Sequence, residues 1–144
     1  MTGQGVTVLQ RLQYDPLDRC VSLNPGSTQR FYRNDRLATE IQGQKQFSFF
    51  EHGTQVLAQQ LREAGQVECA LQATDLQGSV LHSLALGQHQ QMVYCVYGHR
   101  SPENGLTSLL GFNGERRDSV TGLYLLGNGH RPFSSVLMRF ICPD

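Results

Sequence analysis

Hydrophobic and polar residues alternate along short stretches of this chain, with the two-residue period typical of β-strands. The four odd positions of Val67–Ala73 are apolar or weakly polar and would share one face of an extended segment, while the even positions of Glu68–Thr74 would share the other. This is the pattern of a half-buried strand. The even positions of Val136–Cys142 alternate in the same way, which predicts another strand near the end of the sequence.

Glycine spacing extends this pattern to the whole chain. Glycines at 26, 43, 53, 65, 78, 87, 98, 105, 111, 114 and 122 mostly stand roughly 7 to 13 residues apart, which is about one strand and one turn. The sequence therefore predicts an all-β fold.

One segment, Thr54–Ala64, allows a second interpretation. Thr54 could cap a helix that Gly65 ends, because apolar residues of the segment lie near one helical face. We prefer a strand, since Gly65-Gln66 lies between two runs that would pair as a hairpin.

A weak internal repeat accompanies the strands. Each copy has an aromatic residue or Thr-Asp, then a short polar turn, then an apolar strand. A hairpin of this size is too small to bury its own apolar face, so neighbouring copies are expected to pair edge to edge in one sheet. The copies are Tyr14–Leu23, Phe31–Ile41, Phe49–Ala58, Thr74–Leu84 and Tyr94–Gly98.

Composition narrows the classes of partner. The chain has 144 residues with 12 basic and 12 acidic side chains, so one domain is expected and no long-range field favours nucleic acid or an anionic membrane. Its longest apolar run, near Met92–Tyr97, is too short to span a bilayer, and its start does not resemble a signal peptide. We expect synthesis and folding in a reducing cytoplasm.

Catalytic and metal-binding motifs are not evident in the sequence. The cysteines Cys20, Cys69, Cys95 and Cys142 are widely spaced, so we expect buried, reduced thiols and neither a metal nor a cofactor. The five histidines fit surface or packing positions, and Gly127–Gly129 fits a hairpin turn rather than a phosphate loop.

Two regions resemble a known family. YDPLDRCVSL, with Tyr14, Asp15 and Arg19, resembles the tyrosine-aspartate repeat of the RHS/YD-repeat family, and GFNGERRD, TGLYLLGNGHR and VLMRF resemble its RHS repeat-associated core. We therefore predict a YD-repeat region at 1–108 and a core segment at 109–144. The core-motif residues are Gly111, Phe112, Gly114, Arg116, Arg117, Asp118, Gly122, Tyr124, Arg139 and Phe140.

This resemblance implies a fold and a function. In the family, which includes polymorphic bacterial toxins and the C component of insecticidal toxin complexes, such repeats form a hollow β-shell around an effector polypeptide. The expected fold is a curved antiparallel sheet, a partial shell, ending in the core segment. The implied function is to encase and present a C-terminal effector; the alternative is a stand-alone repeat protein that binds a glycan or a partner protein.

The family core also resembles an aspartic protease that cuts its own chain beyond the core. Such chemistry needs two carboxylates with separated pKa values. Asp144 matches the first acid, whereas the second lies in an Asp-Pro-x-Gly segment that this sequence does not contain. We therefore expect no enzymatic activity from the chain as given, and cleavage only in a longer product.

Further expectations concern charges and partners. Arg116, Arg117 and Asp118 are expected in a solvated turn, with a structural ion pair that orients the core as the alternative. The expected partners are the effector region of the same longer chain and a component of a secretion system or toxin complex, with export by a specialised route. Unpaired edge strands are expected to make the chain self-associate.

Overall fold

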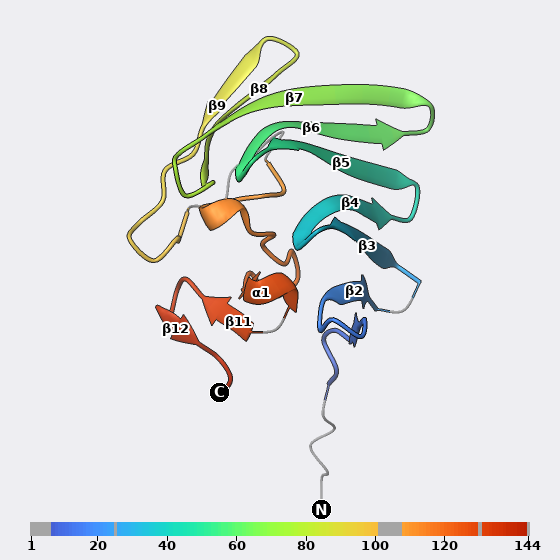
Figure 1. Ribbon diagram of the computed structural model, residues 1–144, viewed down its shortest axis with the longest axis vertical. Helices are drawn as coiled ribbons and strands as arrows, with labels where there is room; N and C mark the ends of the chain where they lie inside the picture. Colours follow the sequence, from blue (N-terminus) through green and yellow to red (C-terminus); the bar gives the residue numbers. More distant parts are fainter. Residues whose placement is uncertain (1–6, 25, 101–107, 130, 144) are drawn as a thin grey trace, which may run out of the picture.

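The computed structural model describes residues 7–24, 26–100, 108–129 and 131–143 (Figure 1). Nine strands follow one another before residue 92, and three short strands lie in the C-terminal part. The strands are β1 (Leu12–Tyr14), β2 (Cys20–Leu23), β3 (Thr28–Arg33), β4 (Arg36–Gln42), β5 (Lys45–His52), β6 (Gln55–Glu63), β7 (Gln66–Thr74), β8 (Val80–Ala85), β9 (Gln88–Gln91), β10 (Tyr124–Leu125), β11 (Arg131–Ser134) and β12 (Arg139–Phe140).

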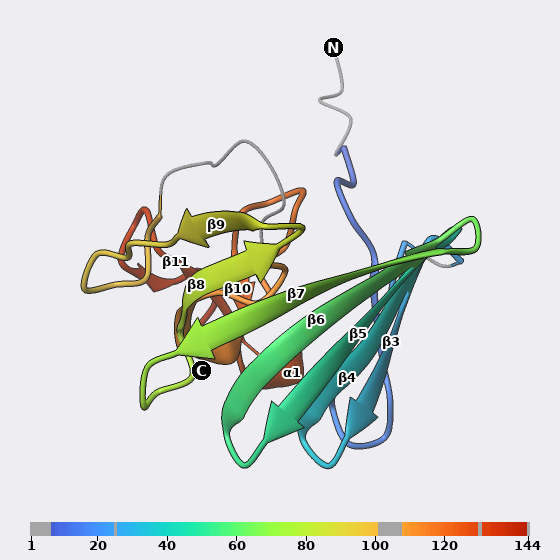
Figure 2. The same ribbon diagram turned by 90° about the horizontal axis from the view of Figure 1, so that it is seen from above.

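The first nine strands form one antiparallel sheet in sequence order, with β1 and β9 at its edges. The sheet is twisted and curved, and its strands fan out when it is seen from above (Figure 2). A second sheet has the order β10-β11-β12. The predicted all-β fold with a curved, open antiparallel sheet is confirmed.

Two very short helical segments complete the described elements: the 3-10 turn η1 (Phe112–Gly114) and α1 (Leu126–Gly129). Within the described part of the chain, neither these nor any other helix has the length and apolar character needed to cross a bilayer.

The weak sequence repeat corresponds to hairpins. The pairs β1-β2, β3-β4, β5-β6 and β7-β8 each contain a register shift close to their turn. An extra residue on the second strand produces the shift, as in a β-bulge, and a bulge increases local twist. These extra residues are Val21, Ala38, Leu57 and Leu81. Four of the five predicted copies are thus four bulged hairpins, paired edge to edge as expected.

Most of the segment Thr54–Ala64 is a strand, β6 (Gln55–Glu63), which confirms the preferred interpretation. Its hairpin turn lies one residue earlier than predicted, at Ala64-Gly65, because Glu63 pairs with Gln66. Both turn residues have positive φ, 49° and 80°, as a type I′ turn requires. Only glycine adopts this conformation without strain, which is why a glycine occupies the second position.

The two faces of β7 are buried in the opposite sense to their hydrophobicity. Ala70 and Gln72 are 7% exposed, whereas Val67 is 51% and Leu71 is 59% exposed. Cys69, on the same outer face, is also exposed, as is Cys95 in a turn. The expectation of buried thiols therefore holds for Cys20 and is wrong for these two, although all of the described cysteines are free.

The predicted strand at Val136–Cys142 is wrong. Residues 135–138 form a turn and only Arg139–Phe140 is a strand, because the chain must reverse between β11 and β12. Ser134 pairs with Arg139, and Met138 adopts a positive φ of 58° inside the turn. The alternating apolar residues Val136 and Met138 therefore lie in an exposed turn and not in a half-buried strand.

The hydrophobic core lies on the inner, concave side of the large sheet, towards the C-terminal part of the chain (Figure 1). Tyr32, Leu61, Tyr94 and Leu109 pack around it. Its buried members are Leu37, Phe47, Phe49, Val56, Val80, Met92 and Leu110.

Candidate functional site

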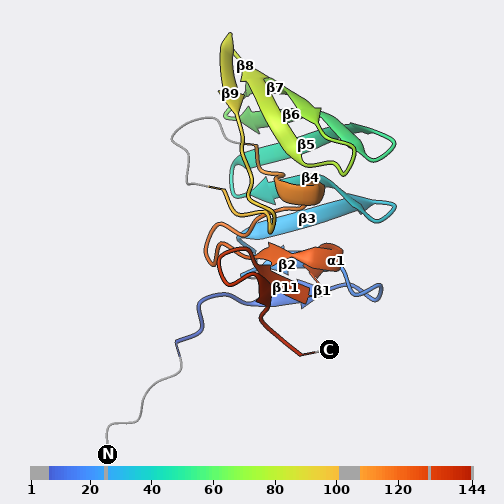
Figure 3. The same ribbon diagram turned by 90° about the vertical axis from the view of Figure 1, so that its left-hand side faces the viewer.

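The C-terminal segment, defined here as the described residues between 108 and 140, lies across the inner face of the sheet (Figure 3). At its start, the Gln72 side-chain amide donates to Ser108 Oγ at 2.8 Å. Gln59 Oε1 accepts a hydrogen bond from Leu109 N at 2.9 Å. Both glutamines are buried. The C-terminal segment therefore provides hydrogen-bond partners for the Gln72 amide nitrogen and for Gln59 Oε1 on the inner face of β6 and β7.

Further along, Glu40 on β4 forms the centre of a buried ion cluster. Glu40 is fully buried and contacts Arg30 Nε at 2.9 Å and Arg116 Nη2 at 3.0 Å, and the Gln42 amide also donates to it. Burial by itself would raise the pKa of Glu40, but the guanidinium groups of Arg116 and Arg30 outweigh it and hold the pKa below its usual value. Arg116 thus joins the C-terminal segment to the sheet through charge.

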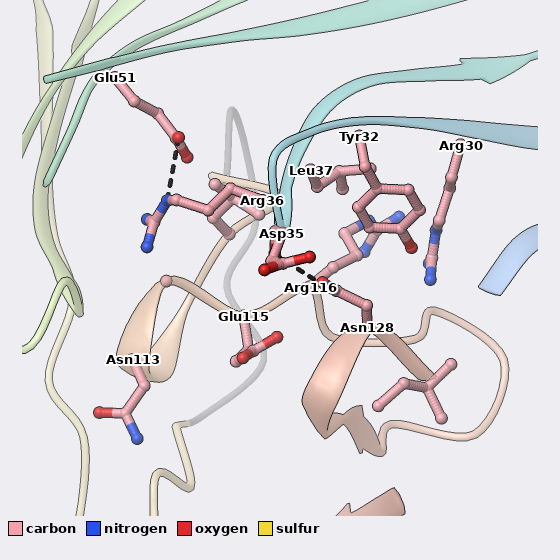
Figure 4. A pocket seen from close by; sticks show the side chains of 13 residues that line it. Arg30, Tyr32, Asp35, Arg36, Leu37, Glu51, Asn113, Glu115, Arg116 and Asn128 are labelled. Carbon is pink, nitrogen blue, oxygen red and sulfur yellow. Dashed lines mark hydrogen bonds and ion pairs between the residues drawn. The ribbon is translucent and has the colours of Figure 1, made fainter. Parts of the chain in front are cut away.

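Beside this cluster lies a small polar pocket (Figure 4). Arg36 Nε contacts Glu51 at 2.9 Å, and the Asn128 side-chain amide donates to the backbone oxygen of Asp35 at 2.8 Å. Burial raises the pKa of Glu115, and nearby Arg36 offsets part of that rise. The cavity is about 60 Å³, enough for a few water molecules. The small cavity, and the pairing of the polar groups around it with one another, are consistent with a structural contact between the C-terminal segment and the sheet.

A five-residue turn occurs four times among the described residues. In each copy the first amide donates to the fifth carbonyl and the fourth amide donates to the first carbonyl, at 2.9 to 3.1 Å. The copies are Asp15–Arg19, Asp75–Ser79, Cys95–His99 and Gly111–Glu115. The first turn of the predicted core motif therefore has the same hydrogen bonding as the turn of the first repeat.

Asp15 and Arg19 stabilise the first of these turns. Asp15 Oδ1 accepts from the amides of Leu17 and Arg19, at 2.9 and 3.0 Å, and Oδ2 contacts Arg19 Nη2 at 2.8 Å. The hydrogen bond from the Arg19 amide is the main reason that the pKa of Asp15 is lowered. Tyr14 donates its hydroxyl to the carbonyl of Gly129 at 2.8 Å. The predicted repeat motif thus forms the turn and binds the C-terminal segment.

The core-motif residues Phe112 and Gly114 fit against glycines of the repeat region. A Cβ on Gly98 would lie 2.6 Å from the Phe112 ring, and a Cβ on Gly114 would lie 3.2 Å from the carbonyl oxygen of Gly78. Phe112 also packs against Tyr94, with ring centroids 5.9 Å apart. Close backbone approach, together with positive φ at Gly98, Gly114 and Gly78, requires glycine here.

The solvated turn predicted for the charged triplet is wrong for Asp118. Asp118 is 3% exposed, and its carboxylate accepts from Thr121 N at 2.8 Å and from Gln10 Nε2 at 3.1 Å. Burial would raise its pKa, but hydrogen bonds from Thr121 outweigh it and the pKa is lowered. Arg117 Nε donates to the carbonyl of Gly122 at 3.1 Å. The ion pair considered as the alternative does exist, but it joins Arg116 to Glu40.

Tyr124 is a buried member of the core motif, at 1% exposed. Its hydroxyl lies 2.9 Å from the position that a Cβ on Gly111 would occupy. Any larger residue at Gly111 would displace this ring, so the two motif positions depend on each other.

The last motif residues lie away from the cluster. Phe140 packs against Phe133, with ring centroids 5.4 Å apart, and the Arg131 guanidinium lies 3.9 Å from the centre of its ring. Arg139 is exposed in β12. Asp144, the candidate acid, lies outside the described residues.

Sequence reasoning missed the partners on the sheet. Glu40, Gln59, Gln72 and Ser79 bind the C-terminal segment, the last through a 2.8 Å hydrogen bond from the amide of Asn113 to Ser79 Oγ. Each is a polar residue that alternates with outward neighbours on its strand or turn. Their polarity was the signal in the sequence, but strand alternation defines two faces without showing which of them is the inner one.

Among the described residues, no cluster of three or more histidine, cysteine, aspartate or glutamate side chains is arranged to hold a metal ion. What these residues form instead is a polar and charged junction between a hairpin sheet and a segment that follows it in sequence.

Comparison with known proteins supports the fold. No protein-family model matches the chain, and no curated protein matches it significantly. Among solved structures, it is similar to the crystal structure of TcdB2-TccC3 with a TM-score of 0.53 and 15% identity, and to TcdB2-TccC3-Cdc42 with a TM-score of 0.52 and 14% identity. Each match covers 94% of this chain and 9% of the other. The chain therefore has the fold of a small part of these much longer toxin-complex chains.

Proposed function

We propose that this chain is a YD-repeat sheet with an RHS repeat-associated core segment, acting as a structural shell and core module of a bacterial toxin. The observation that carries the proposal is the junction itself: the predicted core motif covers the inner face of the predicted repeats through Arg116, Glu40 and the matched turns. The shared fold with part of TcdB2-TccC3 supports the same assignment.

In this proposal the module encases and presents an effector that follows it in a longer product. Curvature gives the sheet a concave side, and the C-terminal segment occupies that side from β7 back to β1. We propose that such a product is made in the bacterial cytoplasm and exported by a specialised route, with a toxin-complex or secretion component as its partner.

Release of the effector by self-cleavage can be tested on the longer product. The family resemblance assigns the first acid to Asp144, so Asp144→Asn should abolish cleavage while thermal unfolding stays unchanged, as judged by intact mass and calorimetry. Asp18→Asn, which changes an exposed turn carboxylate, is the matched control and should cleave normally. Normal processing of the Asp144 variant would refute the protease assignment.

Self-association follows from the open sheet. Strands β1 and β9 are the edges of the large sheet, and an edge strand offers backbone groups that pair with another chain. We expect light scattering to show oligomers whose fraction rises with protein concentration. A monomer that stays compact at high concentration would count against an open shell fragment.

The second candidate function is a stand-alone binding sheet for a glycan or a protein. Exposed apolar residues on its outer face favour it: Phe50, Leu71 and Leu84 are 50%, 59% and 44% exposed. Expressing the complete reading frame of the source gene and weighing the product separates the two functions. A cleaved tail supports the toxin module, whereas a product that ends at residue 144 supports the binding sheet.

A further inference from the structure

Two histidines on the outer face of the β8-β9 hairpin form a pair that has no role in the proposed function. His82 lies on β8 and His89 on β9, and His82 Nδ1 is 2.8 Å from His89 Nε2. Their rings are nearly parallel, at 14°, with centroids 5.0 Å apart. Both side chains are accessible to solvent, so an ion could reach the nitrogens without opening the fold.

The backbone holds this pair in place. Register sets Leu84 opposite His89 and His82 opposite Gln91, so the two histidines are diagonal neighbours on adjacent antiparallel strands. Ser83 and Ala85 are buried, which fixes His82 and Leu84 on the outer face. Diagonal neighbours of this kind are within reach of each other's side chains. The spacing therefore follows from the strand pairing.

We propose that His82 and His89 form a two-histidine site for a divalent late transition-metal ion such as Zn²⁺ or Cu²⁺. Metal–imidazole bonds of about 2.0–2.1 Å in tetrahedral geometry place two nitrogens about 3.3 Å apart. A small ring movement therefore allows an ion to replace the proton that the two nitrogens share. Water completes the coordination, because the described residues supply no third histidine, cysteine or carboxylate to this pair.

The surroundings select the class of ion. The neighbouring outer positions in register are Ala73 and Leu71 on β7 and Gln91 on β9, none of which carries a charge. Ca²⁺ and Mg²⁺ prefer carboxylate oxygens, whereas neutral imidazole suits Zn²⁺, Cu²⁺ and Ni²⁺. Within this group the usual order of affinities places Cu²⁺ first.

The effect of such an ion is to join β9 to β8. Strand β9 has four residues, three of them exposed, and it is an edge of the large sheet. An ion held by both strands binds only the paired form, so it favours pairing by mass action. The site is independent of the toxin assignment and would stand if that assignment failed.

The test is a Zn²⁺ titration by calorimetry on the full, tag-free chain carrying Cys69→Ser and Cys95→Ser, which removes the exposed thiols as competing ligands. We expect one saturable site, and at least a tenfold loss of affinity in His82→Gln and in His89→Gln. His52→Gln, at an exposed histidine outside the pair, is the matched control and should bind within twofold of the parent. No saturable binding, or equal binding in a double His82/His89 variant, would overturn the proposal.

Two further measurements report on the pair itself. With Cu²⁺, electron paramagnetic resonance should show coupling to two imidazole nitrogens, and the coupling should fall to one nitrogen in either single variant. Hydrogen exchange of the β9 amides should slow when Zn²⁺ is added to the parent and should not change in His89→Gln. Metal binding that leaves β9 exchange unchanged in the parent would refute the proposed joining of the strands.

Discussion

The two faces of the large sheet differ in how they combine polar and apolar residues. The inner face buries Arg30, Glu40 and Gln72 beside the hydrophobic core, while the outer face exposes Phe50 and Leu71. The outer residues form a cross-strand row, since Phe50 pairs with Ala58, Ala58 with Leu71 and Leu71 with Leu84. Burial here depends on the C-terminal segment, because among the described residues this segment covers the inner face and hydrogen-bonds to Glu40, Gln59 and Gln72.

Removing the central charge should break this arrangement most strongly. Glu40→Gln leaves Arg30 and Arg116 buried without their carboxylate, and such a loss costs about 3 kcal/mol of the free energy of unfolding. Urea denaturation measures the change. Glu63→Gln is the control, because its pair with Lys45, at 3.6 Å and about half exposed, should contribute less than ~1 kcal/mol. Equal losses in the two variants would contradict a special role for the inner face.

The next largest effect concerns how the stability difference between the parent and Glu40→Gln changes with pH. Because the folded-state pKa of Glu40 is lowered, its ionised form stabilises the protein above the unfolded value of about 4.3. This stabilisation is lost as the pH falls through the folded-state pKa. The gap between the parent and Glu40→Gln should therefore be full at pH 7 and shrink below about pH 4. Urea curves across this range test the sign, and a gap that widens in acid would contradict it.

A neutral polar contact should give a smaller effect. Gln59→Leu leaves the amide of Leu109 buried without its acceptor, which costs about 1–2 kcal/mol. The neighbouring Gln60 points to the other face of β6, so Gln60→Leu should change stability by no more than ~0.5 kcal/mol. Chemical denaturation of the two variants compares the inner and outer faces of β6 at neighbouring positions. A larger loss in Gln60→Leu would reverse the assignment of inner and outer faces.

The smallest effect is expected on the outer row. Leu71→Lys should change the free energy of unfolding by no more than ~0.5 kcal/mol, because Leu71 is 59% exposed. Ala70→Lys, on the inner face, should cost at least about 2 kcal/mol, since it would bury a charge without a partner. Hydrophobicity alone predicts the reverse order. Thermal unfolding of the two variants decides between the two accounts.

Local chemistry explains what the sequence predicted well. Turns such as Asp15–Arg19 are stabilised by hydrogen bonds among residues at most four apart, so the repeated hairpins could be recognised from short motifs. The strand at Thr54–Ala64 was recognised for the same reason, because Ala64-Gly65 supplies its hairpin turn.

Long-range contacts explain what the sequence did not show. The inner face of β7 is set by Ser108, which is 36 residues from Gln72, and the partner of Glu40 is 76 residues away at Arg116. Alternation gives two faces and leaves open which one is covered. At Val136–Cys142 the alternation was misleading, because the pairing of Ser134 with Arg139 imposes a reversal there.

The return of the C-terminal segment from β7 to β1 has a consequence for synthesis on the ribosome. Tyr14 emerges 115 residues before Gly129, its partner in the folded protein. At about 5–20 residues per second, the hairpins exist for several seconds before their cover is made. During that time Arg30, Glu40 and Gln72 on the future inner face remain hydrated, beside apolar core residues such as Phe47 and Phe49 that are not yet covered. These polar groups thus reduce the apolar surface that the growing chain exposes to water until its final residues arrive.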